Sequence, residues 1–215
     1  AVCMNKAAAK LLAFSAGIES TPFIQLNSYE RKLAQSAVDE ALLYPVFVKP
    51  LNGGSSVGIT KVKHPSELDA ALDVALECDS AVIIEQGVIG REIEVAVFGT
   101  GEDAVASVCG EIKAGAEFYD YKDKYIDSAA QLFIPAELPE SVADEVRTAA
   151  LTVFNALGCS GLSRVDFFVC GEDVIFNEIN TIPGSTPISM YPKLFEYGKL
   201  PYSQLIDKLI SSVLE

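Results

Sequence analysis

Two segments in the C-terminal third of the chain predict a β-hairpin with a charged face. Residues 162–170 and 174–178 have the pattern of strands and are separated by a short turn. A three-residue loop, 171–173, would set Asp166 directly opposite Glu178, with about 5 Å between their Cβ atoms. This hairpin therefore brings two carboxylates face to face, which constrains what can lie between them.

The facing carboxylates indicate a cation site, because they repel each other unless a cation lies between them. Asp, Glu and Asn oxygens are the hard ligands that Mg²⁺ prefers, and Asn180 shares a strand face with Glu178. Arg164 supplies a positive charge on the face of Asp166, and the loop 181–186 can present backbone N–H groups to an anion. The alternative is that both acids only solvate an exposed face of the sheet.

A second signal is the glycine-rich loop that follows Lys49. Residues 44–50 predict a strand bracketed by prolines, 51–58 a loop, and 59–62 a returning strand. Glycines let backbone N–H groups approach phosphate oxygens, while the serine hydroxyls and Lys49 add donors and charge. The loop is not a Walker loop, since no Gly-Lys-Ser/Thr sequence ends it and a strand follows. It indicates a phosphate clamp, with an ordinary mobile hairpin as the alternative.

Two further segments carry weaker signals. Glu85 and Glu92 flank a hinge-like connection after the short buried strand 81–85, and a charged strand edge is the alternative interpretation. The polar segment 113–130 carries three tyrosines and two lysines within residues 118–125. Loops of that length inside compact domains are usually functional or disordered, and a solvated charge run is the alternative here.

Helices alternate with the strands and indicate an α+β chain. Apolar side chains recur at helical spacing on one face of several segments. The predicted helices cover residues 5–16, 28–43, 66–76, 139–157 and 203–214, and further strands cover 23–26, 91–98, 104–112 and 131–134. The hinge near residues 86–90 predicts a boundary between two lobes.

Charge and composition exclude several classes of protein. With 16 Lys+Arg against 30 Asp+Glu, the formal net charge of −14 would repel nucleic acid and anionic membranes, so neither is expected as a partner. A hydrophobic fraction of 50% excludes a disordered chain. Five scattered cysteines without a C-x-x-C pair, no apolar run of about 20 residues and no secretory signal predict a cytoplasmic protein. The start at Ala1, with Met4 inside a helix-like run, predicts a fragment of a longer protein.

Taken together, these segments resemble the D-alanine–D-alanine ligase family of the ATP-grasp superfamily, from about Met4 to the C-terminus. The matching motifs are Met4-Asn5-Lys6, Val48-Lys49-Pro50, Gly54-Ser55-Ser56-Val57-Gly58, Glu85 with Glu92, Phe118-Tyr119-Asp120-Tyr121 through Lys124-Tyr125, Gly158-Cys159 through Arg164-Val165-Asp166, and Asn177-Glu178-Ile179-Asn180-Thr181 with Pro183-Gly184. The resemblance implies an α+β, ATP-grasp fold, in which two α+β lobes with mainly antiparallel sheets grip ATP between them. Residues 1–93 would form the smaller central lobe, and residues 94–215 the larger C-terminal lobe with the metal site and the long loop 113–130.

The same resemblance implies roles for individual residues. The ATP-binding residues would be Lys6, Lys49, Gly54, Ser55, Ser56, Glu85, Gln86, Val88, Glu92, Lys124 and Asn177. Two Mg²⁺ or Mn²⁺ ions would be held by Asp166, Glu178 and Asn180. The catalytic residues would be Ser56, Tyr125, Arg164 and Gly184, and the residues at the carboxylate of the second substrate would be Ser189 and Met190.

The implied reaction joins two D-alanines through an acyl phosphate at the expense of ATP, and supplies D-alanyl-D-alanine for peptidoglycan precursors. The family has an N-terminal lobe whose glutamate joins Ser56 and Tyr125, and the resemblance, which starts at about Met4, does not include that lobe. We therefore expect this chain alone to bind nucleotide and to ligate poorly. Asn5 replaces the usual Asp, and Gln86 replaces a frequent Lys. The resemblance leaves a homodimer of the full-length protein open.

Two other functions stay open at this point. A D-alanine–D-serine or D-alanine–D-lactate ligase of the vancomycin-resistance type would share the ATP and metal residues. Tyr125 argues against lactate, and residues 189–194 resemble the ordinary dipeptide enzyme. A non-catalytic ATP-grasp module that only binds nucleotide ranks third, because a scaffold has no physical reason to keep together the set of Arg164, Asp166, Glu178 and Asn180.

Overall fold

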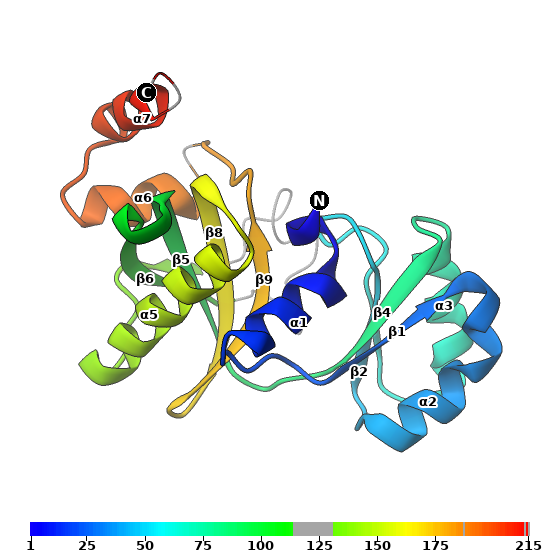
Figure 1. The fold of residues 1–215 in the computed structure, drawn as a ribbon. Coiled ribbons are helices and arrows are strands. Elements are labelled where there is room, and N and C mark those ends of the chain that lie inside the picture. Colours follow the sequence, from blue (N-terminus) through cyan, green and yellow to red (C-terminus); the bar gives the residue numbers. More distant parts are fainter. Residues whose placement is uncertain (114–130, 187, 213, 215) are drawn as a thin grey trace.

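The computed structural model describes residues 1–113, 131–186, 188–212 and 214, which form two β-sheets covered by helices (Figure 1). The first sheet has the order β1 (Phe23–Asn27), β4 (Ala81–Gln86), β2 (Val46–Pro50) and β3 (Thr60–Val62). The second has the order β7 (Gln131–Phe133), β6 (Val105–Lys113), β5 (Arg91–Thr100), β8 (Ser160–Cys170) and β9 (Asp173–Asn180). Neighbouring strands pair antiparallel in both sheets, so the predicted α+β class with mainly antiparallel sheets is confirmed.

The described α-helices are α1 (Lys6–Ser15), α2 (Ala34–Ala41), α3 (Leu68–Leu76), α5 (Glu140–Ala156), α6 (Met190–Tyr197) and α7 (Tyr202–Ser211). Short 3₁₀ turns are η1 (Val2–Met4), η2 (Ser28–Leu33), η3 (Pro65–Glu67) and η4 (Gly101–Asp103). None of these helices is long and apolar enough to cross a membrane.

Two helical segments differ from the prediction. Residues 28–43 were expected as one helix, but a capping box between Asn27 and Glu30 begins the 3₁₀ turn η2, and α2 follows it. Helix α6 was not predicted, because Pro192 interrupts its pattern. Pro192 lies in the first turn of α6, where a missing backbone N–H costs no helical hydrogen bond.

Alternation along the first sheet separates an apolar face from a charged face. Val48 of β2 and Ile84 of β4 are buried against α3, where Leu72 belongs to the same core cluster. Lys49 and Glu85 are the next residues along these strands, so they lie on the opposite face. The charged face is therefore the one that α2 and α3 leave uncovered.

The second sheet is covered on both faces. Val95 belongs to the core cluster that contains Val153 of α5, while its neighbour Ala96 belongs to the cluster that contains Leu194 of α6. Figure 1 shows α5 lying across the strands beside α1. The two helices cover one face, and α6 covers part of the other.

Helix α1 contacts both sheets. Its N-cap residue Asn5 accepts a hydrogen bond from Ala8 N at 2.9 Å, which begins the helix. Ala9 and Ala13 pack into the core of the second sheet, whereas Ala7 packs with Ile83 of the first. The helix therefore lies where the two sheets meet, as Figure 1 shows.

The strand pairing of the β8–β9 hairpin is confirmed, but its loop differs from the prediction. Asp166 pairs with Glu178 as expected. The turn contains only two residues, since Cys170 already pairs with Asp173. The register then shifts by one between Asp166 and the next residue, so that Asn177 forms a β-bulge. The bulge supplies the residue that the shorter loop removes, and the two carboxylates meet after all.

Candidate active site

Three carboxylates form a row across three adjacent strands of the second sheet. Glu94 of β5 pairs with Asp166 of β8, which pairs with Glu178 of β9. Directly paired residues of antiparallel strands project to the same face, with about 5 Å between Cβ atoms. We call these three residues the carboxylate row. Glu94 was not among the predicted site residues, although an acid at the centre of an apolar strand was a signal that could have identified it.

Arg164 holds two members of the carboxylate row. Its Nε and Nη2 donate to Asp166 Oδ1 and Oδ2 at 2.8 and 2.7 Å, and Nη2 lies 3.2 Å from Glu94 Oε1. Burial by itself would lower the pKa of Arg164, but the charges of Asp166 and Glu94 raise it well above its ordinary value. The guanidinium therefore stays charged and fixed by two acids.

The carboxylate row has the chemistry of a divalent-metal site. Three carboxylates face one guanidinium, which leaves a surplus of negative charge. Asn180 adds a further oxygen, and its Oδ1 accepts a hydrogen bond from Ile182 N at 3.0 Å. Within the described residues, no three acidic, histidine or cysteine side chains already converge on one point. The donor set of Asp166, Glu178 and Asn180 fits Mg²⁺ or Mn²⁺ by its oxygen atoms and its charge.

The facing side of the site carries ammonium groups. Lys49 Nζ forms an ion pair with Glu85 Oε2, and Lys6 Nζ donates to Gly53 O at 2.8 Å. Burial alone would lower the pKa of Lys49, but Glu85 and Glu178 raise it. Burial lowers the pKa of Lys6, against the opposing charge of Glu178. The charge of Glu178 therefore acts on both lysines and on Arg164.

Glu85 is shared between two lysines, one of which was not predicted to belong to the site. Its Oε1 lies 3.1 Å from Lys10 Nζ, and Oε2 pairs with Lys49. Burial by itself would raise the pKa of Glu85, but the charges of Lys10 and Lys49 lower it to about 2. We call Lys6, Lys10, Lys49 and Glu85 the lysine group. Both oxygens of Glu85 lie against lysines inside the protein, so its carboxylate is directed at these lysines and not at a bound molecule.

The glycine-rich loop borders the lysine group. Gly54 and Ser55 are exposed, and Ser56 is half-buried. Ser55 and Ser56 adopt positive φ angles of 55° and 58°. At Gly58, with φ of 73°, an added Cβ would lie 2.8 Å from Pro50 Cγ. The tip of the loop, at Gly54 and Ser55, is thus exposed, while the position of Gly58 at its base has no room for a side chain.

Three other predicted residues lie in or next to the linker between the sheets, and a fourth, Asn177, lies on β9. Gln86 projects away from Glu85, since its Oε1 accepts from Leu43 N at 3.0 Å on the opposite face of the first sheet. Val88 is half-buried in the linker that precedes β5. Glu92 lies two residues before Glu94 on β5, and its charge raises the pKa of Lys49. Asn177 forms the bulge beside Glu178.

The loop after β9 carries the remaining predicted residues. An added Cβ at Gly184 would lie 2.7 Å from Ser189 Oγ, so the two residues are in close contact. Ser189 Oγ accepts from Thr186 N at 3.0 Å. Met190 is buried in the cluster of α6, and its sulfur lies 2.9 Å from where a Cβ would stand at Gly110, the residue that pairs with Glu94. Lys124 and Tyr125 lie outside the described residues.

Comparisons with known proteins agree with this arrangement. A family model described as "D-ala D-ala ligase C-terminus" matches residues 12–211. The chain is 51% identical to a D-alanine–D-alanine ligase of Chlorobium limicola, covering 98% of the chain and 59% of that protein. It is 46% identical to D-alanine–D-alanine ligase A of Salmonella typhimurium, covering 100% of the chain and 60% of that protein.

Solved structures give the same result. The VanG D-Ala:D-Ser ligase from Enterococcus faecalis superposes with a TM-score of 0.90 at 38% identity, over 98% of this chain and 62% of that one. The D-alanine–D-alanine ligase from Coxiella burnetii superposes with a TM-score of 0.83 at 36% identity, over 98% of this chain and 56% of that one. The chain spans roughly 60% of the relatives it matches, has the ATP-grasp fold, and belongs to the D-alanine–D-alanine ligase family.

Proposed function

We propose that the protein containing this chain is an ATP-dependent ligase that joins two D-alanines through an acyl phosphate. The observation that carries the proposal is that the lysine group meets the strand of Glu178: Lys10 donates to the backbone oxygen of Phe176 on β9, and the charge of Glu178 acts on Lys6 and Lys49. One side offers positive charge to phosphates, and the other offers oxygen ligands to the metal that accompanies them. The lobe of residues 1–93 would supply the lysine group, and the lobe of residues 94–215 would supply the carboxylate row. We also propose that the protein is cytoplasmic.

The nucleotide would lie between the two groups. Lys6 and Lys49 would bind phosphate oxygens, and the loop of residues 53–58 would close over them with its backbone N–H groups and serine hydroxyls. Asp166, Glu178 and Asn180 would hold two Mg²⁺ or Mn²⁺ ions, which neutralise phosphate charge when bound. Glu92 would meet the ribose hydroxyls, and the backbone near Val88 would meet adenine.

The reaction depends mainly on stabilising negative charge on the transferring phosphoryl group and on the tetrahedral intermediate. A carboxylate oxygen of the first D-alanine forms a bond to the γ-phosphorus of ATP, and ADP leaves. The amine of the second D-alanine then attacks the acyl carbon and loses a proton, and phosphate leaves. Arg164, held by two carboxylates, is oriented to stabilise negative charge on the transferring group and on the tetrahedral intermediate. The Gly184 backbone would assist, and Ser189 would lie near the second substrate.

D-Serine as the second substrate is an alternative that one observation favours. The VanG D-Ala:D-Ser ligase superposes on this chain with a TM-score of 0.90, above the 0.83 of the D-alanine–D-alanine ligase from Coxiella burnetii. Backbone similarity reports the shared nucleotide-binding machinery more than the acceptor pocket, so the sequence relatives that are named D-alanine–D-alanine ligases carry greater weight.

Mass spectrometry of the reaction products tests the proposal. The full-length parent protein is incubated with Mg-ATP, D-alanine and equal amounts of D-serine and D-lactate. A dominant D-alanine dimer is expected. A dominant D-alanyl-D-serine would assign the protein to the resistance-type ligases, and no product despite ATP binding would overturn the ligase in favour of a nucleotide-binding module.

A further inference from the structure

Lys10 is a buried lysine that connects both sheets. It lies on α1 one helical turn after Lys6, and only 1% of its surface is exposed. Its ammonium lies 3.1 Å from Glu85 Oε1 in the first sheet. It donates to Thr21 Oγ1 at 2.9 Å and to the backbone oxygen of Phe176 in the second sheet at 3.4 Å.

The contacts of the ammonium come from three parts of the fold. Lys10 donates two hydrogen bonds, to Thr21 and Phe176, and forms an ion pair with Glu85. The ring of Phe176 lies beneath the charge, 5.7 Å from Nζ. An ammonium buried this completely costs several kcal/mol in desolvation, so its retention requires compensation that a neutral side chain would not need.

The single carboxylate of Glu85 forms ion pairs with two ammonium groups, those of Lys10 and Lys49. Lys10 engages Oε1 and Lys49 engages Oε2. The Lys49 side chain is 14% exposed, whereas that of Lys10 is 1% exposed, so only Lys49 can reach a bound molecule. Two ammonium groups and one carboxylate leave a net positive charge, and that charge is available at Lys49.

From this geometry we infer that Lys10 is a positioning residue for nucleotide phosphates, which acts through Glu85 on Lys49. The inference rests on the proposed function, because it assumes that Lys49 meets the phosphates. Without Lys10, Glu85 and Lys49 would form a neutral pair, and the attraction of Lys49 for phosphate would weaken.

The test measures nucleotide affinity in the full-length parent protein. Lys10→Met removes the charge and keeps the length of the side chain. We expect the Kd for Mg-ADP and the KM for ATP to rise on the order of tenfold, the size typical of losing a group that orients a ligand-binding side chain. The KM for D-alanine should stay unchanged, because the effect is confined to the phosphate side of the site.

A double variant separates positioning from simple structural support. Lys10→Met combined with Glu85→Gln removes both buried charges and leaves Lys49 without a neutralising partner. We expect this variant to bind Mg-ADP within about threefold of the wild type, which a purely structural role would not restore. It also contains neither of the two fully buried ions, Lys10 and Glu85, so it decides the question alone where Lys10→Met fails to fold. A larger loss in the double variant would overturn the inference.

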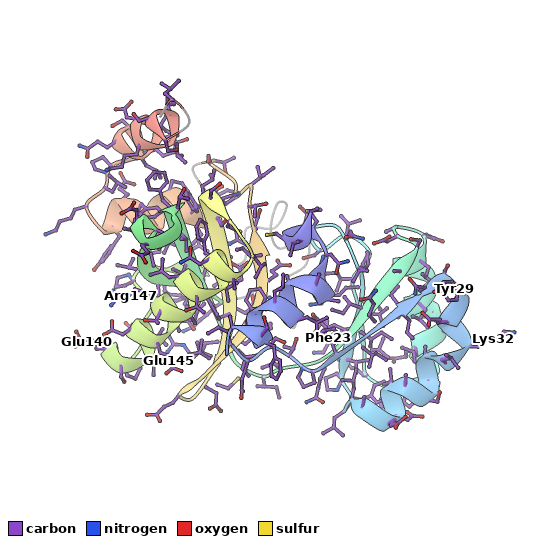
Figure 2. All side chains as sticks on the ribbon, viewed as in Figure 1. Phe23, Tyr29, Lys32, Glu140, Glu145 and Arg147 are labelled. Carbon is purple, nitrogen blue, oxygen red and sulfur yellow. The ribbon has the colours of Figure 1, made fainter. Side chains whose placement is uncertain are left out.

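A surface lysine provides the matched control. Lys32 is exposed and lies at the far end of the first sheet from the second sheet, as Figure 2 shows. Lys32→Met changes the net charge by the same amount, and its Kd for Mg-ADP should equal that of the wild type. Equal affinity of Lys10→Met and the wild type would overturn the inference alone, whereas a wild type that neither binds nucleotide nor forms dipeptide would overturn the proposed function.

Discussion

Replacing Glu85 by glutamine should destabilise the protein in a way that depends on pH. The Glu85 carboxylate lies between Lys10 and Lys49, with 3% of the side chain exposed. Burial acts to raise its pKa, and the two lysines lower it from 4.5 to about 2. At about 1.36 kcal/mol per pKa unit, this difference corresponds to roughly 3 kcal/mol of folding free energy at neutral pH.

The direction of the pH dependence follows from the lowered pKa. The folded protein holds the ionised form more strongly than the unfolded chain, so the contribution is fully present above pH 4.5. It is lost as the pH falls toward 2, where Glu85 becomes protonated in the folded state too. Between pH 7 and pH 3 the contribution should decrease by about 2 kcal/mol.

Urea unfolding of the wild type and of Glu85→Gln at pH 7 and pH 3 measures this contribution. We expect the variant to be less stable by about 3–5 kcal/mol at pH 7, because Lys10 becomes a buried charge without its carboxylate partner. The difference in unfolding free energy between wild type and variant should be smaller at pH 3. The exposed Glu145 on α5, labelled in Figure 2, gives the control Glu145→Gln, whose unfolding free energy should stay within about 0.5 kcal/mol of the wild type at both pH values. If Glu85→Gln differs from the wild type by the same amount at both pH values, the ionised Glu85 carboxylate does not stabilise the fold as described.

Three further predictions concern the site and α1. Glu178→Gln should abolish dipeptide formation while leaving the protein folded, since it removes a metal ligand's charge at constant volume; retained turnover would contradict the metal assignment. Glu94→Gln should lower kcat about tenfold with the Kd for Mg-ADP unchanged, because Arg164 loses one of its two carboxylate partners at 3.2 Å; an unchanged kcat would show that Asp166 orients Arg164 alone. Asn5→Ala should cost about 1 kcal/mol in urea unfolding through loss of the α1 cap, and Asn5→Asp, which keeps the acceptor, should cost less.

In the β8–β9 hairpin the sequence pattern predicts the pairing of the two carboxylates correctly but the length of the turn incorrectly. The strand pattern predicts Asp166 opposite Glu178 if the loop between the strands has three residues. The structure makes the same pair through a two-residue turn and a bulge at Asn177. Strand alternation and the requirement to bury Phe176 and Ile179 set which side chains face inward, so the functional pair is kept although the turn differs.

The site residues that sequence reasoning missed depend on contacts between distant segments. Glu94 joins the site because β5 pairs with β8 in a register that sets it beside Asp166. Lys10 joins it because α1 docks between the two sheets and brings its ammonium to Glu85. Neither residue has a motif of its own, and an isolated acid or lysine in the sequence is usually a solvated charge.

Local spacing along the chain is enough to predict the alternation of strands and helices, their apolar faces and the residue types that could bind phosphate and metal. These features arise from residues close together along the chain, where spacing alone sets the face of a strand or helix. Three relations in the site come instead from distant segments: Arg164 holds two acids, Gln86 faces away from Glu85, and Lys10 shares Glu85 with Lys49. Those relations depend on the register of non-consecutive strands and on the docking of α1, which the packing of the two cores sets.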